Sequence, residues 1–162
     1  MTTKEILDNL NRQFPDAIVS SVAEGLHPHV QVKPERLTAV CGYLKAQPGL
    51  KFDLLRCITA VDWPAKNAIE LSYDLISVET TQALAVKVSV DRARPRIASV
   101  SAIWPAANWH EREAFDLMGV AFENHPDLRR ILMPEDWEGH PLRKDYQDPV
   151  EYHGISVKPC EK

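Results

Sequence analysis

Two runs of alternating apolar residues constrain the fold of this chain most strongly. In residues 69–76 and again in residues 84–90, every second side chain is apolar. Since successive side chains of a strand point to opposite faces, both runs predict strands with one covered and one solvated face. A third run, residues 50–61, also has strand character, and the connections at 64–67 and 79–82 are short enough for hairpins. The pattern therefore predicts an antiparallel meander.

Two amphipathic helices are predicted to cover the apolar face of this sheet. The first begins with a capping-box pattern at Thr2 and Glu5, and the second follows Pro34 with apolar residues at helical spacing over 37–44. Further short strands are expected at residues 17–22, 29–32 and 97–100. The predicted fold class is α+β: an antiparallel meander sheet with helices packed on one face, followed by an irregular C-terminal tail.

The composition is that of a single soluble globular domain. The 162 residues are 44% hydrophobic and 26% charged, and the net charge of −4 gives no general attraction to nucleic acid or anionic lipid. Cys41, Cys57 and Cys160 form no C-x-x-C pair, which argues against a disulfide framework, a structural zinc site or a cysteine-ligated cluster. The sequence shows neither a signal peptide nor a membrane span, so we expect a reducing cytoplasm and membrane contact only through partners.

Residues 104–146 concentrate the unusual chemistry of the chain. They hold three of the four tryptophans, three of the six histidines and nine acidic residues. Within them, Asn108 and Glu111 resemble a capping box and Gly119 a left-handed C-cap, which predicts a helix over 109–118. On this helix Arg112 and Asp116 are an i, i+4 pair, whereas Glu111 faces the apolar side and needs an arginine or several N–H donors to stay charged.

The flanking segments are predicted to be loops and turns. Arg92, Arg94 and Arg96 are expected to form a solvated hairpin tip, with an anion or partner contact as the alternative. After the helix, residues 120–122 read as extended, 124–126 as a turn and 134–137 as a single helical turn.

Enzymatic sites find limited support. His110-Glu111 begins the zinc-protease pattern H-E-x-x-H, but Ala114 occupies the second histidine position. Carboxylates such as Glu111 and Glu113 lie beside arginines, which favours structural ion pairs over acid–base catalysis. A metal site from His125, Asp127 and His140 stays open by spacing alone, and with it a stand-alone hydrolase that uses a metal or a carboxylate. No glycine-rich loop for a dinucleotide or for ATP is present.

The tryptophans next to arginines have the composition of protein interface anchors. In this region the chain strongly resembles the 30-kDa subunit family of respiratory complex I, the proton-pumping NADH:quinone oxidoreductase. The resemblance is carried by these motifs: Asn108-Trp-x-Glu-Arg-Glu113, Asp116, Gly119-Val120, Phe122, His125-Pro-Asp-Leu-Arg-Arg-Ile-Leu132, Asp136-Trp137, Gly139 and Pro141-Leu-Arg-Lys-Asp145.

This resemblance implies a non-catalytic subunit of the peripheral arm in a hetero-oligomer. It implies that the chain binds neither flavin nor iron–sulfur cluster and that FMN and the clusters belong to partner subunits. The expected partners are the large quinone-site subunit and the small iron–sulfur subunit, with no nucleic acid. The expected location is the cytoplasmic face of the inner (plasma) membrane, as a peripheral protein. Related ferredoxin-dependent, F420-dependent and hydrogenase complexes contain equivalent subunits, so the electron donor stays open.

We therefore expect an α+β domain over residues 1–140 and an extended tail over 141–162 that docks on partner subunits. No catalytic, cofactor-binding or metal-ligating residue is assigned. The residues expected to form internal ion pairs and partner contacts are Trp109, Glu111, Arg112, Glu113, Asp116, His125, Arg129, Arg130, Trp137, Arg143, Lys144 and Asp145.

Overall fold

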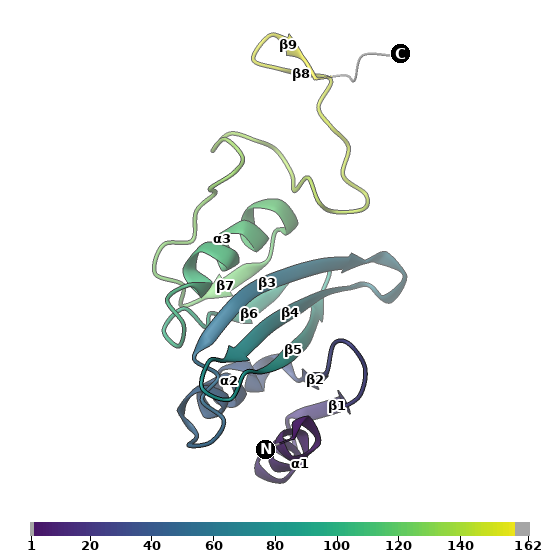
Figure 1. The fold of residues 1–162 in the computed structure, drawn as a ribbon. Helices are drawn as coiled ribbons and strands as arrows, with labels where there is room; N and C mark the ends of the chain where they lie inside the picture. The colour runs from purple at the N-terminus through teal and green to yellow at the C-terminus, as the bar shows by residue number, and fades with distance from the viewer. Residues whose placement is uncertain (1, 158–162) are drawn as a thin grey trace.

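The computed structural model describes residues 2–157, and its elements follow one another along a chain that is coloured from purple to yellow in Figure 1. They are α1 (Thr3–Gln13), β1 (Ile18–Val22), β2 (His29–Val32), η1 (Pro34–Arg36), α2 (Leu37–Ala46), β3 (Leu54–Trp63), η2 (Pro64–Lys66), β4 (Ala68–Ser77), β5 (Gln82–Asp91), β6 (Arg96–Ala98), α3 (Ala107–Met118), β7 (Ala121–Glu123), β8 (Glu151–Tyr152) and β9 (Ile155–Ser156).

The five-stranded sheet confirms the predicted α+β fold. Its order is β1-β2-β5-β4-β3, in which β3, β4 and β5 form the antiparallel meander. The hairpin of β1 and β2 joins the other side of β5 through a parallel pairing that the sequence pattern had not indicated. The sheet therefore has two free edges, β1 and β3.

Alternation places the apolar side chains of β4 and β5 on one face, as predicted. Ile69, Leu71 and Tyr73 are fully buried, and they share one core with the buried residues of α1 and α2. The capping box of α1 is present, because the Thr2 hydroxyl accepts from the Glu5 N–H while the Glu5 carboxylate accepts from the Thr2 N–H. The opposite face is polar, and Arg56, Asp74 and Lys87 line a hollow of about 430 Å³ there.

Some predicted boundaries were wrong. Strand β3 begins at Leu54 and not at residue 50, because Leu50 and Lys51 belong to a turn in which both N–H groups donate to the Gln47 carbonyl. Residues 134–137 form one hydrogen-bonded turn, Trp137 N–H to Pro134 carbonyl, and no helix. The short strand β6 covers 96–98. It pairs in parallel with β7, which places residues 96–98 beside 121–123.

After β7 the chain passes α3, touches strand β3 through Lys144 and reaches the end of the molecule opposite α1 (Figure 1). The described tail is not wholly irregular, since β8 and β9 form a small antiparallel hairpin. Cys160 and the other residues beyond 157 lie outside the described part of the chain, as does part of the predicted 141–162 tail.

Candidate functional site

Helix α3 organises the region that the sequence singled out. It ends as predicted at Gly119, whose backbone is left-handed with φ of 73° and whose N–H donates to the Phe115 carbonyl. Its start was predicted wrongly, because Asn108 lies within the helix and Ala106 is the N-cap. The turn at Val100–Trp104 and the bond from the Ala107 N–H to the Trp104 carbonyl already set the helical path before Asn108 is reached.

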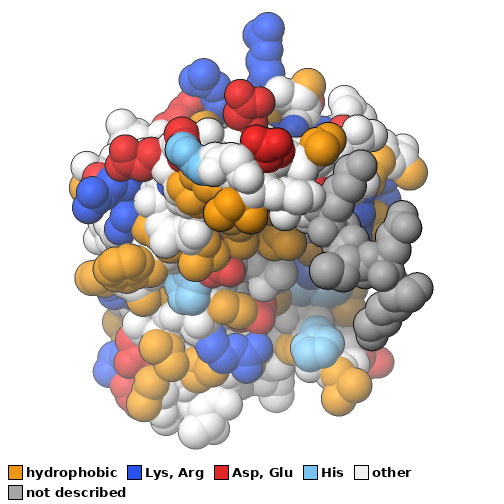
Figure 2. Space-filling view, turned by 90° about the horizontal axis from the view of Figure 1, so that it is seen from above, with side chains coloured by type: hydrophobic (Ala, Val, Ile, Leu, Met, Phe, Trp, Pro, Cys, Tyr) orange, Lys and Arg blue, Asp and Glu red, His pale blue; other side chains and the backbone are white. Residues whose placement is uncertain are grey.

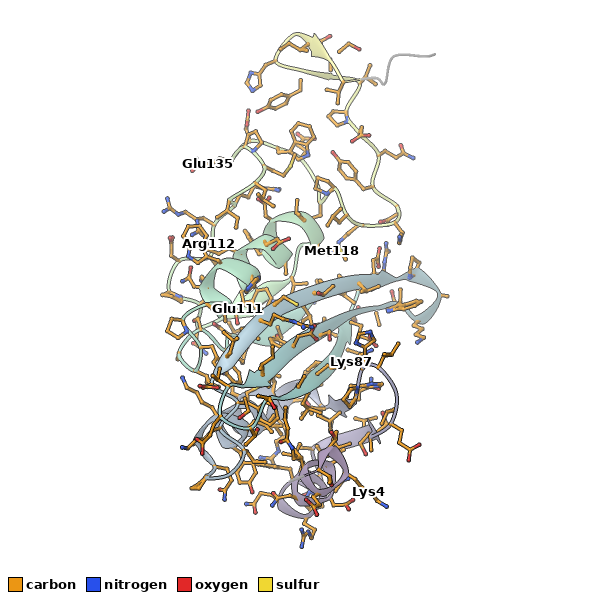
Figure 3. All side chains as sticks on the ribbon, in the orientation of Figure 1. Lys4, Lys87, Glu111, Arg112, Met118 and Glu135 are labelled. Atoms are coloured by element: carbon orange, nitrogen blue, oxygen red, sulfur yellow. The ribbon has the colours of Figure 1, made fainter. Side chains whose placement is uncertain are left out.

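Glu111 points from α3 into the core and is fully buried (Figure 3). Its carboxylate accepts from the Ser99 hydroxyl at 2.6 Å and from the Val100 N–H at 2.7 Å. His125 Nε2 lies 3.8 Å from the Glu111 carboxylate, and no arginine pairs with Glu111 among the described residues. Of the expected stabilisers, an arginine or several N–H donors, the structure shows one N–H donor together with the Ser99 hydroxyl. Burial raises the pKa of Glu111 to about 7 although both hydrogen bonds act in the opposite direction. Glu111 is thus a core acid held by Ser99 and Val100.

His125 closes the other side of this buried site. Its Nδ1 accepts the Asp127 N–H at 3.0 Å, so the neutral ring carries its proton on Nε2. That Nε2 lies 3.2 Å from the Asn108 carbonyl and donates to it. Nε2 of His125 therefore joins the loop after β7 to helix α3, and Nδ1 holds the backbone of that loop.

Asp116 forms the second buried carboxylate site. Its Oδ2 accepts the backbone N–H groups of residues 131–133 at 2.9, 2.7 and 2.9 Å, and its Oδ1 accepts from Arg130 Nη1 at 2.8 Å. Arg130 Nη2 continues to the carbonyls of Trp137 and Gly139. Burial acts to raise the pKa of Asp116, but the four donors outweigh it and leave that pKa lowered. The Asp116 carboxylate therefore fixes the backbone of residues 131–133 and, through Arg130, the backbone at residues 137 and 139.

Arg112 does not pair with Asp116 as its i, i+4 spacing had predicted. Its Nε donates to the Arg129 carbonyl at 3.3 Å, and its guanidinium lies 4.9 Å from the centroid of the Trp109 ring. Arg112 and Glu111 leave α3 in different directions (Figure 3). Trp109 itself is 62% exposed, and Glu113 is exposed on the same helix.

A third site fastens the tail to the sheet, and it includes two residues that the sequence analysis missed. Asp62 on β3 is 3% exposed and receives Arg92 through two bonds, at 2.7 and 2.9 Å. Arg92 also donates to Asp145 at 2.6 Å, and the Lys144 N–H donates to Asp62 at 2.9 Å. The hydrogen bonds of Arg92 hold the pKa of Asp62 below its usual range. Arg92 is thus a clamp between sheet and tail, not part of a solvated tip.

The tail makes further contacts with α3 and with itself. Arg143 Nε donates to the Met118 carbonyl at 2.8 Å. Trp137 donates its ring N–H to the Tyr146 hydroxyl at 3.0 Å and lies 5.0 Å from the Tyr152 ring. Figure 2 looks onto this end of the molecule, where apolar side chains are mixed with charged and histidine side chains. In the tail, Leu142 is 57% exposed.

The histidines and the aspartate that the sequence left open as metal ligands do not meet in the described residues. Within residues 2–157, no three His, Cys, Asp or Glu side chains converge as metal ligands would. His140, which the sequence left open as a ligand, has its Nδ1 2.9 Å from the Asp116 carbonyl, and Asp127 pairs with the exposed Arg129 at 3.0 Å. Across that same part of the chain, no helix has both the length and the apolar character to cross a bilayer.

Comparison with known proteins identifies the family. Residues 30–152 match the model of the "Respiratory-chain NADH dehydrogenase, 30 Kd subunit" family. The chain belongs to this family. The matching NADH-quinone oxidoreductase subunit of Moorella thermoacetica is 48% identical over 142 residues, which cover 87% of this chain and 93% of that protein. Its counterpart in Roseiflexus sp. (strain RS-1) is 44% identical over 141 residues, 86% of this chain and 81% of its own.

Two solved structures have a similar fold. A chain of an archaeal respiratory membrane complex, the membrane-bound sulfane sulfur reductase, superposes with a TM-score of 0.75 at 31% identity and covers 89% of this chain and 85% of its own. The trypsin-resistant fragment (1-134) of Nqo5 superposes with a TM-score of 0.67 at 27% identity, and the match covers 79% of this chain and all of the fragment.

Proposed function

We propose that this chain is the 30-kDa subunit of a proton-translocating NADH:quinone oxidoreductase and that it acts as a non-catalytic docking subunit of the peripheral arm. The identity of 48% to the Moorella thermoacetica subunit over 87% of the chain is the observation that carries the proposal. On this view the chain stabilises the quinone-site subunit and the small cluster-bearing subunit while electrons pass from NADH to quinone through those neighbours.

The bonding of the motif residues supports a structural role. An acid or base that works in catalysis must reach a substrate, and its polar atoms must be free to do so. The Asp116 carboxylate already accepts hydrogen bonds from four donors, and both ring nitrogens of His125 are hydrogen-bonded to backbone groups. These side chains keep α3, the loop after β7 and the tail in one arrangement, which is what a preformed docking surface requires.

The proposal includes partners, cofactors and location. FMN and iron–sulfur clusters are placed in the partner subunits and none in this chain. The complex lies at the cytoplasmic face of the plasma membrane, and this chain is peripheral to it. Among the predicted interface residues on α3 and the tail, those proposed to face partners are the exposed ones, namely Trp109, Glu113, Lys144 and Asp145.

Affinity purification tests the proposal directly. The chain, tagged at its N-terminus next to α1, is expressed from its own locus and purified from native membranes in mild detergent. We expect co-purification of a quinone-site subunit and a cluster-bearing subunit in equal amounts, with NADH:quinone activity in the eluate. Recovery of the chain from membranes without any quinone-site subunit would overturn the proposal.

A related complex with another electron donor is the second candidate. It is favoured by the match to a chain of the archaeal sulfane sulfur reductase complex, which is 31% identical over most of both chains. Assay of the same eluate with NADH and with reduced ferredoxin separates the two candidates. NADH oxidation supports the first candidate, and oxidation of ferredoxin alone supports the second.

A further inference from the structure

Arg112 is a buried arginine whose charge has no acidic partner among residues 2–157. It is 7% exposed, yet no carboxylate of the described residues forms an ion pair with it. Two other arginines with mostly buried side chains, Arg92 and Arg130, are 17% and 16% exposed, and each binds a buried aspartate. The guanidinium is charged at every accessible pH, so Arg112 cannot escape the cost of burial by losing a proton.

The contacts that Arg112 does make compensate only part of this cost. Its Nε donates to the Arg129 carbonyl, and its guanidinium rests on the Trp109 ring. Its two terminal nitrogens make no hydrogen bond within residues 2–157. Both are accessible from outside, since the Tyr73 hydroxyl is the only fully buried side-chain polar atom without a partner in that part of the chain. The fork of the guanidinium therefore stays open to an incoming acceptor while its stem is fixed.

Trp109 extends this site into a surface that suits a protein partner. Trp109 is 62% exposed, and the Arg112 guanidinium lies over its ring. Tryptophan and arginine are among the side chains most enriched at the energetic centres of protein interfaces. Asn108, which together with Trp109 precedes Arg112 by about one helical turn, borders a shallow hollow of about 350 Å³. The hollow is lined by Ser101, Ala102, Pro105, Asn108, Asn124 and Pro126.

We propose that Arg112 and Trp109 form a receptor for an aspartate or glutamate side chain of a neighbouring subunit. The carboxylate would accept two parallel N–H bonds from the open fork of Arg112, and the residues beside it would cover Trp109 and enter the adjacent hollow. This inference rests on the proposed function, because the acid must come from a partner in the complex. Charge complementarity selects the occupant, since a cation with an open fork and no counter-charge among residues 2–157 favours an anionic group over an apolar or basic one.

A structure of the purified complex tests the geometry. We expect a carboxylate oxygen of another chain at about 2.7–2.9 Å from a terminal nitrogen of Arg112. Water alone, or a backbone carbonyl of the partner, at this position would overturn the inference. If the chain is present in the complex with Arg112 facing solvent, only this inference fails. If the chain purifies without other subunits, the proposed function fails instead.

Substitution of Arg112 tests the energy of the proposed contact, because it should affect the stability of the isolated chain little and its association with partner subunits strongly. Arg112→Met keeps an unbranched side chain but removes the charged guanidinium that lies over Trp109, so the thermal midpoint of the isolated full chain should fall by no more than about 3 °C or should rise. Association of the same variant with its partner subunits should weaken about tenfold to a thousandfold, measured as subunit recovery over a series of NaCl concentrations. If the thermal midpoint of the isolated chain and the recovery of partner subunits fell together, Arg112 would serve the fold alone, and the inference would be overturned.

Two further variants control the experiment. Arg12→Met removes a charge from the exposed face of α1, where Arg12 bonds the Asp8 carbonyl, and should leave subunit recovery unchanged. Arg112→Lys keeps the charge but not the planar fork, so recovery should lie between that of the wild type and that of Arg112→Met. Equal recovery for Arg112→Met and Arg12→Met would overturn the inference.

Discussion

Asp116 offers the sharpest test of how α3 organises the region after it. Asp116→Ala removes the acceptor of three backbone N–H groups at residues 131–133 and leaves Arg130 without its carboxylate. Hydrogen bonds to a charged group are worth about 1.5–3 kcal/mol each and do not add fully, whereas loss of one member of a buried pair costs about 3–5 kcal/mol. We therefore expect a loss of about 4 kcal/mol, or about 8–16 °C in thermal midpoint for a chain of this size.

The assay is thermal unfolding of the full chain near pH 7, followed by circular dichroism. The folded pKa of Asp116 is lowered, so its stabilisation is complete above the unfolded aspartate pKa of about 4 and is lost as the pH falls through the folded pKa. Asp127→Ala is the matched control, because Asp127 also pairs with an arginine of this segment but is exposed, and it should shift the midpoint by less than about 2 °C. Equal shifts in both variants would refute the assigned role of Asp116.

Three further substitutions have defined outcomes. The pKa of Glu111 is raised to about 7, so the native state retains a proton that the unfolded chain releases, and the wild type should lose about 3 kcal/mol of unfolding free energy between pH 4.5 and 7. Glu111→Gln should abolish this decline, which urea titrations at pH 5 and 7.5 check. An unchanged pH dependence in the variant would contradict the assigned pKa. Tyr73→Phe deletes a buried hydroxyl that has no hydrogen-bond partner among residues 2–157, so the unfolding free energy should stay the same or rise by up to about 1 kcal/mol; a lower value would contradict this. Gly119→Ala should lower the thermal midpoint more than Gly49→Ala does, because both backbones are left-handed but only at Gly119 would the new Cβ lie 2.5 Å from the His140 ring.

Features that depend on neighbours along the chain were predictable. The alternation over 69–76 and 84–90 predicted β4 and β5, and Gly119 predicted the end of α3. Each follows from a local rule: the period of side chains in a strand, or the freedom of glycine at positive φ. The start of α3 escaped prediction, because the turn before it already follows a helical path and makes the cap at Asn108 unnecessary.

Partners of charged side chains were not predictable by the same means. Helical spacing favoured Arg112 for Asp116, but the i, i+4 pair on a helix is worth only a few tenths of a kcal/mol, and Arg130 together with three N–H donors offers far more. Arg92 likewise reads as one of three loop arginines, and nothing near it in sequence indicates the buried Asp62, thirty residues earlier. Arg92 pairs with Asp62 because β3 and β5 lie on either side of β4, which brings the end of β3 near the residue after β5.

The sequence by itself determined the α+β class, the family motifs and the concentration of charge in residues 104–146. The class and the charge follow from periodicity and composition, and the motifs from the order of the residues, all of which are properties of the chain before it folds. Only the tertiary structure decided that Glu111 is a core acid beside His125, that Asp62 holds the tail through Arg92, and that Arg112 is buried without an acidic partner among residues 2–157. The reason is that Coulomb and hydrogen-bond energies depend on distance in space and on burial, and a one-dimensional spacing specifies neither.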